Sequence, residues 1–425
     1  MKRVALVLVV LIAVTLIASG VVVSAPSGRG AAPVPRGQGR ANFVEDEVLV
    51  SFRPDVSPAV VARSVGARIH GEIEGLGVHV LNVPPGSVEG TVRALTNNPL
   101  VEFAEPNGYV QAFVTPNDPS LPNQWAWGKV QAYAAWDSVQ GSGTVRVAVV
   151  DTGIDVGDPN YIWGPDLTGH EDLVKCQSII IKSFISGESG NDDNGHGTHV
   201  AGTIGACTNN AIGVAGANWA VQLMGVKVLY YDGSGTISAV SNGIKWAADN
   251  GAKVINLSLG TSSPYRTLER AVNYAWNKGA VLACAAGNDN STARTYPAAY
   301  TNCIAVAATD QNDARASFSS FGSDWVDVAA PGVNIFSTMQ DDFNWCFLCY
   351  WYGVPGLYAY LSGTSMATPH VAGLAALIWA KGSCTINSCV RNKIQSTADQ
   401  ISGTARNGTG NSWYWGRVNY YEALK

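Results

Sequence analysis

From residue 114 onward, short and nearly continuous apolar runs alternate with longer amphipathic segments. Such runs are typical of strands in a parallel sheet that is covered on both faces, and the segments between them have the apolar spacing of helices. The alternation therefore predicts an α/β fold with three layers and a mostly parallel sheet. We expect strands at residues 145–150, 223–228, 254–258, 281–286 and 303–308, and helices at residues 238–250 and 267–278.

Residues 43–113 have a different pattern, which predicts a separate small domain. Polar and apolar positions alternate as in strands, and these strands are interrupted by two helical segments. We expect strands at residues 48–53, 78–83 and 101–106, and helices at residues 57–65 and 87–95. This βαββαβ-like order indicates a ferredoxin-like α+β domain.

The N-terminus has the layout of an export signal. Lys2 and Arg3 precede an apolar stretch over residues 4–23, and the small residues Ser24 and Ala25 follow it. This is the order of a secretory signal, so we expect residues 1–25 to be removed. The stretch is also close to the ~20 residues that span a bilayer, so an uncleaved membrane anchor is the alternative. Residues 26–42, rich in Pro, Gly, Ala and Arg, are expected to be a linker.

Composition and charge are those of a globular protein. Of the 425 residues, 47% are hydrophobic, and the net charge is −5. The whole net negative charge lies from residue 114 onward, where there are 18 basic and 23 acidic residues. The balance argues against a nucleic-acid partner and is compatible with bound cations.

The eight cysteines all lie after residue 114. In an exported chain this even number favours disulfides, and Cys346 with Cys349 or Cys384 with Cys389 could pair locally. A redox or zinc role for Cys346 and Cys349 is the weaker alternative, because no second Cys or His pair lies near them. Eight cysteines allow 105 pairings, so the full pattern stays open.

Three motifs bring an acid, a base and a nucleophile in a fixed order. Asp151 ends the apolar run Val-Ala-Val-Val-Asp-Thr-Gly, His196 lies in Asn-Gly-His-Gly-Thr-His, and Ser365 lies in Gly-Thr-Ser-Met-Ala-Thr-Pro-His. A serine hydroxyl is a poor nucleophile unless an imidazole takes its proton and a carboxylate holds that imidazole. The order Asp, His, Ser is the order found in subtilisin. From about residue 41 to the C-terminus, the chain resembles the subtilisin-like serine proteases, and among them the thermitase group.

The resemblance assigns a role to each catalytic residue. Asp151 would orient His196, and His196 would act as general base toward Ser365. Asn288, which follows the strand at 281–286, would donate to the oxyanion together with the backbone N–H of Ser365. His199, one helical turn after the base, would be a packed helix residue, and so would His370.

The resemblance also implies how substrate is held. Two edge segments would clamp an extended peptide by strand addition, and a third would line the first pocket. The pocket walls carry no acid, which suits a broad preference for apolar or aromatic side chains at P1. The edge residues would be Gly233, Ser234 and Gly235 on one side and Ser258, Leu259 and Gly260 on the other, with Ala285, Ala286 and Gly287 in the first pocket.

Calcium is the cofactor that the resemblance implies. The loop at residues 208–214 is similar to the calcium loop of the family, and hard cations take oxygen ligands. Carboxylates would come from Asp118 and Asp172, a side-chain oxygen from Asn210, and carbonyl oxygens from Thr208, Ile212 and Val214. Glu188, Asp192 and Asp193 could form a second site, but they do not reproduce the spacing of the family, and a solvated loop is the alternative.

Together these features predict a secreted, calcium-stabilised serine endopeptidase of proteins and peptides, a monomer made as a precursor. Residues 43–113 would be a prodomain that assists folding and inhibits the enzyme, with self-cleavage after Phe113, and residues 114–425 the peptidase domain. An unrelated α+β domain is the alternative for the first part. A catalytically silent surface protein and a dinucleotide-binding enzyme are the rival functions; the second lacks the Gly-x-Gly-x-x-Gly motif after a strand.

Two segments depart from the family pattern. Extra residues at 156–169 lengthen the loop that leads to Asp172. Residues 341–358 form an insertion ahead of Ser365 that carries six aromatic side chains within residues 343–352. We expect this insertion either to pack on the domain or to form a wall over the primed subsites, on the leaving-group side of the cleft.

Overall fold

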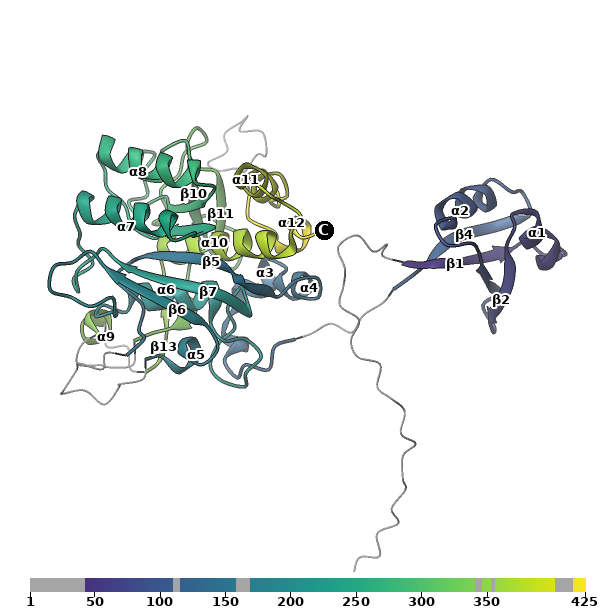
Figure 1. Cartoon of the computed structure of the whole chain (residues 1–425), viewed down its shortest axis with the longest axis horizontal. Coiled ribbons are helices and arrows are strands. Elements are labelled where there is room, and N and C mark those ends of the chain that lie inside the picture. The colour runs from purple at the N-terminus through teal and green to yellow at the C-terminus, as the bar shows by residue number, and fades with distance from the viewer. Residues whose placement is uncertain (1–42, 110–114, 158–168, 341–345, 353–355, 402–415) are drawn as a thin grey trace, which may run out of the picture. The chain divides into compact units, whose positions relative to one another are not determined.

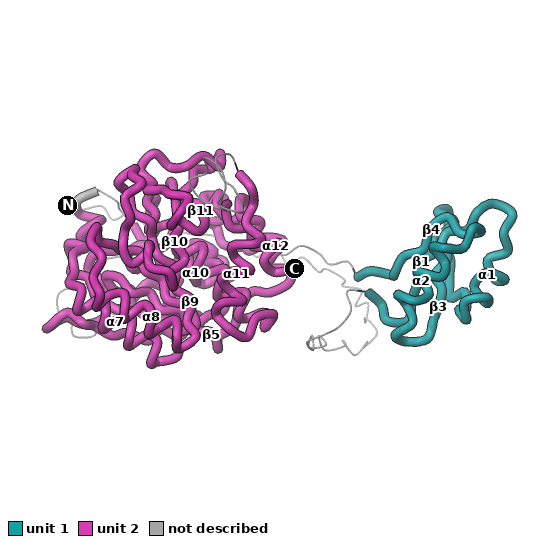
Figure 2. Tube along the Cα trace, turned by 90° about the horizontal axis from the view of Figure 1, so that it is seen from above, with its two compact units in different colours: residues 1–110 teal, residues 111–425 magenta. Residues whose placement is uncertain are grey.

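The computed structural model describes residues 43–109, 115–157, 169–340, 346–352, 356–401 and 416–425. The chain divides into two compact units, residues 1–110 and 111–425 (Figure 2). The expected signal and linker, residues 1–42, lie outside the described residues, as does the expected cleavage point at Phe113. Within the described ranges, none of the helices has both the length and the apolar character needed to cross a membrane.

The first unit is a four-stranded antiparallel sheet with the strand order β2-β3-β1-β4. Its core is formed by the apolar faces of the strands and helices, with Val48, Val50, Leu81 and Leu95 fully buried. The expected α+β class is confirmed, and the structure adds β2, which the sequence pattern did not resolve. The elements are β1 (Phe43–Phe52), α1 (Pro58–Ser64), β2 (Arg68–Ile73), β3 (Val78–Asn82), α2 (Val88–Thr96) and β4 (Val101–Gly108).

The second unit is built on a seven-stranded parallel sheet with the strand order β11-β10-β9-β8-β5-β7-β6. All five expected strands are present at its centre. The sequence pattern missed the two edge strands, β6 and β11. The strands are β5 (Gly141–Asp151), β6 (Ser178–Ser183), β7 (Ala220–Lys227), β8 (Val254–Leu257), β9 (Val281–Ala285), β10 (Cys303–Thr309) and β11 (Val328–Pro331).

Helices cover both faces of this sheet (Figure 1). Alternate residues of β5 explain why: Val147 and Val149 belong to one buried cluster, and Ala148 and Val150 belong to the other. The first cluster joins α6 (His196–Gly205) and α10 (Thr364–Lys381), and the second joins α7 (Ile237–Asp249) and α8 (Arg266–Asn277). The predicted three-layer α/β class is therefore confirmed.

Shorter elements complete the second unit. A two-stranded antiparallel hairpin, β12 (Ile335–Thr338) and β13 (Tyr358–Leu361), pairs Thr338 with Tyr358 at its far end. This hairpin carries the inserted segment. The remaining elements are η1 (Leu121–Asn123), α3 (Trp125–Lys129), α4 (Ala132–Trp136), α5 (Glu171–Val174), α9 (Phe347–Tyr352), α11 (Asn387–Ser396) and α12 (Tyr420–Ala423).

All eight cysteines are paired in the structure. Two disulfides are local, between Cys346 and Cys349 and between Cys384 and Cys389. Two others bridge larger separations, from Cys176 to Cys207 and from Cys284 to Cys303. The second of these ties the neighbouring strands β9 and β10.

Candidate active site

The predicted catalytic residues gather at one edge of the large sheet. Asp151 is the last residue of β5, Ser258 directly follows β8, and Asn288 lies three residues after the end of β9. Because these strands are parallel neighbours, their carboxyl ends meet at the same edge. His196 is the first residue of α6, and Ser365 is the second residue of α10.

Asp151 and His196 form a direct hydrogen bond. The Nδ1 atom of His196 lies 2.7 Å from Oδ1 of Asp151, and the same oxygen accepts a hydrogen bond from the backbone N–H of Thr152 at 2.8 Å. The Asp151 side chain is fully buried. Burial lowers the pKa of His196, but the charge of Asp151 and its hydrogen bond oppose this, and the resulting pKa lies above its ordinary value.

Close packing fixes the start of α6 against the end of β5. A Cβ added to Gly197 would lie 2.1 Å from the carbonyl oxygen of Gly153, so only glycine allows this approach. The N–H of Gly197 donates to Oγ1 of Thr152 at 2.9 Å. Asp192, which is buried, accepts from the N–H and the hydroxyl of Thr198 at 2.9 and 2.6 Å. The position of His196 relative to Asp151 is therefore set by close backbone packing and by hydrogen bonds from the start of α6 to Thr152 and Asp192.

Ser365 is held by Ser258. The Ser365 hydroxyl donates to the Ser258 carbonyl oxygen at 3.1 Å, and the Ser258 hydroxyl donates to the Ser365 carbonyl oxygen at 2.8 Å. Within the described residues, no hydrogen bond joins Ser365 to His196. Catalytic hydrogen bonds are often long without substrate and tighten in the complex.

Asn288 lies against the start of α10. Its Oδ1 accepts hydrogen bonds from the backbone N–H and the hydroxyl of Thr364, at 2.9 and 3.0 Å. Since these two donors fix the oxygen, the amide nitrogen faces the other way, 3.5 Å from the Cβ position of Gly363. The side-chain N–H group of Asn288 is thereby presented next to Ser365.

Lys227 is a buried cation at this edge that the sequence analysis missed. Its side chain is 1% exposed at the end of β7, and its Nζ donates to the Thr152 carbonyl oxygen at 2.9 Å. It also pairs with Asp193 at 2.6 Å and Glu188 at 3.3 Å. A lysine inside a strand that is buried on both faces requires partners of this kind. The presence of Lys227 in the apolar run at residues 223–228 was therefore the signal from which a buried ion pair could have been predicted. The acidic loop is thus partly exposed, and two of its acids pair with an internal ammonium group.

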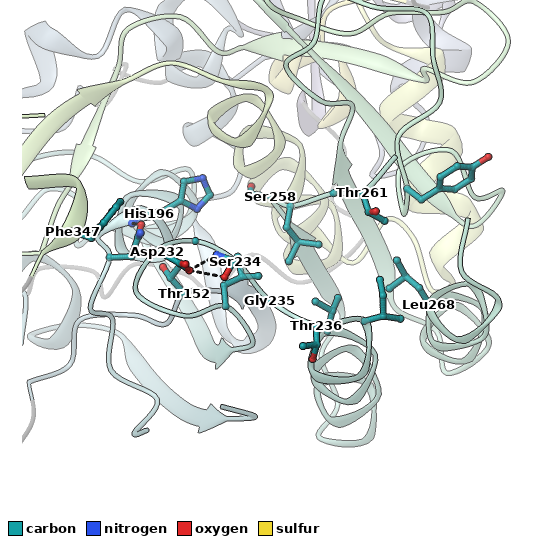
Figure 3. Close-up of a pocket in the computed structure, with 18 of the residues that line it drawn as sticks. Thr152, His196, Asp232, Ser234, Gly235, Thr236, Ser258, Thr261, Leu268 and Phe347 are labelled. Carbon is teal, nitrogen blue, oxygen red and sulfur yellow. Dashed lines mark hydrogen bonds between the residues drawn. The ribbon is translucent and has the colours of Figure 1, made fainter. Parts of the chain in front are cut away.

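A cleft of about 630 Å³ runs from His196 between the two predicted edge segments (Figure 3). All six edge residues line it, whereas Ala285, Ala286 and Gly287 do not. The sequence analysis missed Thr295, whose side chain lies between Gly260 of an edge segment and Gly287 of the predicted first pocket. Cβ atoms at Gly260 and Gly287 would come within 2.6 and 2.8 Å of it. Further lining residues are Thr152, Asn194, Leu229, Asp232, Thr236, Ile237, Val240, Thr261, Tyr265, Leu268, Tyr296, Phe347 and Leu348.

The chain matches two known family patterns. The subtilase family pattern matches residues 142–414, and the fervidolysin N-terminal prodomain pattern matches residues 30–107. Thermitase of Thermoactinomyces vulgaris is 47% identical over 312 residues, which cover 73% of this chain and 99% of thermitase.

The chain belongs to the subtilase family.

Two further similarities extend this result. A thermophilic serine proteinase of Bacillus sp. strain AK1 is 43% identical over 387 residues, covering 90% of this chain and 88% of that protein. A solved protease structure from Pseudoalteromonas arctica superimposes with a TM-score of 0.60 at 31% identity, over 73% of this chain and 99% of that one. This subtilase is accordingly a serine endopeptidase that carries an N-terminal prodomain.

The described part of the insertion reaches the cleft of this subtilase. The β12–β13 hairpin carries it to α9, where Phe347 and Leu348 line the cleft with His196 and both edge segments. The wall over the primed subsites stays a prediction. Residues 341–345 and 353–355 of the insertion lie outside the described residues.

The predicted calcium residues of the subtilase converge around two buried acids. Asp172 accepts hydrogen bonds from the N–H of Val214 at 2.8 Å and from Nδ2 of Asn210 at 2.9 Å. Asp118 accepts from the N–H groups of Asn209 and Asn210 at 2.9 and 3.2 Å. Burial raises the pKa of Asp172 to about 7, and the charge of Asp118 adds to this shift. Neither acid is paired with a lysine or arginine among the described residues.

The surrounding oxygen atoms suit a hard cation. In the described chain, no hydrogen bond uses the carbonyl oxygens of Thr208, Ile212 or Val214, although all three lie in the same loop as Asn210. Two carboxylates and free carbonyl oxygens are the ligand types that Ca²⁺ prefers. One predicted ligand differs in orientation: Asn210 points its amide nitrogen at Asp172, and its oxygen accepts from the N–H of Ile212 at 2.8 Å.

The other two motif histidines are packed inside the domain, as predicted. His199 is fully buried, with Nε2 at 3.0 and 3.1 Å from the carbonyl oxygens of Ile335 and Ala359, and burial lowers its pKa to about 3. His370 is fully buried with Nδ1 at 2.9 Å from the carbonyl oxygen of Met366, and burial lowers its pKa to about 4.

Proposed function

We propose that this subtilase is a secreted, calcium-stabilised endopeptidase that matures by its own activity and cleaves after apolar or aromatic P1 residues. The observation that carries the proposal is the 2.7 Å hydrogen bond between buried Asp151 and His196, at the end of a cleft next to Ser365. The side-chain amide of Asn288 offers a hydrogen-bond donor beside the same serine.

The proposed reaction is acyl transfer through Ser365. The Nε2 atom of His196 takes the hydroxyl proton while the serine oxygen attacks the scissile carbonyl, and Asp151 stabilises the imidazolium that forms. Nδ2 of Asn288 and the backbone N–H of Ser365 stabilise the oxyanion, and the start of α10 adds a favourable dipole. His196 then gives its proton to the leaving amine, and water releases the acyl group by the same steps.

The two edge segments support an extended binding mode for the substrate. Residues 233–235 and 258–260 line opposite parts of the cleft, so a peptide between them can add as a strand. Its P1 side chain would lie toward residues 285–287, near the serine. The apolar walls there favour apolar P1 residues, and Thr295 limits the depth of the pocket.

We propose that the first unit inhibits the peptidase until self-cleavage after Phe113. Hydrogen bonds of the following segment support a mature chain that begins ahead of Asn117. The Asn117 N–H donates to Oδ1 of Asn209 at 3.2 Å, its Oδ1 accepts from the N–H of Ala211 at 2.9 Å, and the N–H of Ser120 donates to the Gly213 carbonyl at 2.8 Å. A mature start beyond Asp118 would remove a proposed calcium ligand.

Export is proposed from the N-terminal signal pattern, and the pairing of all eight cysteines is compatible with an oxidising compartment. The partners would be protein and peptide substrates and the prodomain of the same chain. Neither nucleic acid nor an oligomer is part of the proposal.

Labelling by a fluorophosphonate probe tests the catalytic assignment. The probe should modify the mature enzyme at Ser365, identified by peptide mass mapping, because only an activated serine reacts quickly. Ser362→Ala is the matched control, since that side chain lies three residues away and accepts from the N–H of Asn334. Labelling of another serine, or undiminished labelling after Ser365→Ala, would refute the assignment.

We propose that Asp118, Asp172 and the loop at 208–214 bind Ca²⁺ in the mature enzyme. A cation that binds only the folded state stabilises it by roughly 2.7 kcal/mol when its free concentration is about 100 times the dissociation constant. Asp172→Asn should lose most of this gain, measured as the rise in melting temperature on adding calcium to chelator-treated protein.

Glu171→Gln is the control for this experiment. It removes the neighbouring acid, which is partly exposed and, among the described residues, pairs with Lys175. It should keep the full response to calcium, because exposed ion pairs contribute little to stability. A melting temperature that chelation does not change, in protein shown to be free of metal, would exclude the site.

A further inference from the structure

Helix α9 belongs to an inserted segment that the family pattern does not explain, and it reaches the cleft. Its first two residues, Phe347 and Leu348, line the cleft together with His196. Both side chains are partly exposed there. In Figure 3, Phe347 lies at the His196 end of the pocket, and Leu268 and Thr261 lie at the other end.

The start of α9 is attached to the loop that precedes His196. The N–H of Phe347 donates to the Asp193 carbonyl oxygen at 3.3 Å, and the N–H of Leu348 donates to the Asn194 carbonyl oxygen at 3.1 Å. These bonds join two backbones, so the place of α9 does not depend on flexible side chains.

The buried disulfide of α9 rests on the residue just before His196. Gly195 has a φ of 96°, and a Cβ there would lie 2.9 Å from Sγ of Cys346 and 2.5 Å from Cε of Met339. Cys346 and Cys349 are almost completely buried. The disulfide therefore braces the helix against the N-terminus of α6.

Phe347 is also connected to the edge segment on the other side. Its ring meets the ring of Tyr231 edge-on, with centroids 5.9 Å apart. Nδ2 of Asn194 donates to the Tyr231 carbonyl oxygen at 2.6 Å. One continuous wall of the cleft is thus formed by helix α9, the loop before His196 and the segment leading to Gly233.

The direction of side chains along an extended substrate decides which residue meets this wall. Successive side chains of a strand point to opposite faces. If P1 points to residues 285–287, then P2 and P4 point to the other face, into the cleft described above. P2 is the one closer to the serine, so it lies at the His196 end, and P4 lies toward Leu268.

We propose that Phe347 and Leu348 form an apolar wall of the P2 subsite, which favours aliphatic or aromatic P2 side chains over glycine or charged ones. The inference rests on the substrate binding mode proposed above. The maturation sequence Val-Gln-Ala-Phe at 110–113 fits it, because it offers apolar Val110 and Ala112 as P4 and P2.

The test is a set of peptide substrates with Phe at P1, Ala at P3 and P4, and Leu, Gly or Asp at P2. For wild type we expect kcat/KM to be at least about 10-fold higher with Leu than with Gly, given that each methylene in such a pocket is worth about 10-fold or more. Phe347→Ala should reduce this ratio by about 5-fold or more. Leu348→Ala should shift it in the same direction, and it gives an independent result if Phe347→Ala does not fold.

Tyr350→Ala is the matched control. Tyr350 is in the same helix and 66% exposed, but it does not line the cleft, so its replacement should leave the P2 ratio unchanged. An unchanged P2 ratio in Phe347→Ala and Leu348→Ala, in enzymes whose active sites titrate fully, would overturn the proposal that these two residues form a wall of the P2 subsite. The wild-type kcat/KM should also rise when the peptide is extended from P2 to P4. If it does not, the proposed extended binding mode is wrong, and the P2 subsite proposal is wrong with it.

Discussion

Replacing Ser365 with alanine should leave the chain as an unprocessed precursor with no measurable endopeptidase activity. The proposed self-cleavage uses the same hydroxyl as cleavage of other substrates, and loss of a nucleophilic serine lowers kcat by about 10⁶-fold. The side chain is small, and in the described part of the chain its one hydrogen bond goes to the carbonyl oxygen of Ser258, so the fold should persist.

Gel electrophoresis and N-terminal sequencing measure this outcome. Wild type should yield a mature chain that starts at Val114, and the variant should keep residues 43–113 attached. Added wild-type enzyme should cut the variant precursor in trans, which would show that its junction is accessible. Maturation of purified Ser365→Ala at the wild-type rate would show that the serine assignment or the self-cleavage is wrong.

Asp151→Asn should lower kcat by about 10⁴-fold without unfolding the protein, because an amide in this place favours the wrong tautomer of the imidazole. In wild type one carboxylate oxygen accepts from both Nδ1 of His196 and the N–H of Thr152, and the negative charge that stabilises the imidazolium is absent from the amide.

The pH profile gives a second measurement of the same variant. The charge of Asp151 raises the pKa of His196, and the base must be neutral to act, so the wild-type rate increases as pH rises through that raised pKa. Without this charge the acidic limb should move to lower pH. Asp155→Asn is the control, since its carboxylate accepts from the N–H of Gly157. A limb that does not move would contradict the coupling.

The centre of the fold could be predicted because its strands are apolar on both faces. The runs that became β5, β7, β8, β9 and β10 carry that signal, whereas β6 at the sheet edge lacks it, because none of its six residues is fully buried. The catalytic motifs could be predicted because each directly follows a strand or starts a helix. Parallel pairing then brings the strand ends together without further information.

The remaining features depend on contacts that local sequence does not encode. The insertion could not be placed because its position follows from the pairing of β12 with β13 and from backbone bonds to Asp193 and Asn194. Thr295 lies in a loop, and only the approach of Gly260 and Gly287 reveals its place. The orientation of Asn210 likewise depends on Asp172, which is distant in sequence, as well as on the nearby N–H of Ile212.

The docking of residues 117–120 onto the loop at 208–214 affects how long such an enzyme lasts. A peptidase at high concentration is surrounded by copies of itself, and each frayed end is a cleavage site for its neighbours. Here the beginning of the proposed mature chain is fastened by Asn117, Asp118 and Ser120 to the same loop that is proposed to bind calcium. Removal of the ion would loosen this end first, so loss of activity in chelator should proceed by autolysis and accelerate as enzyme concentration increases.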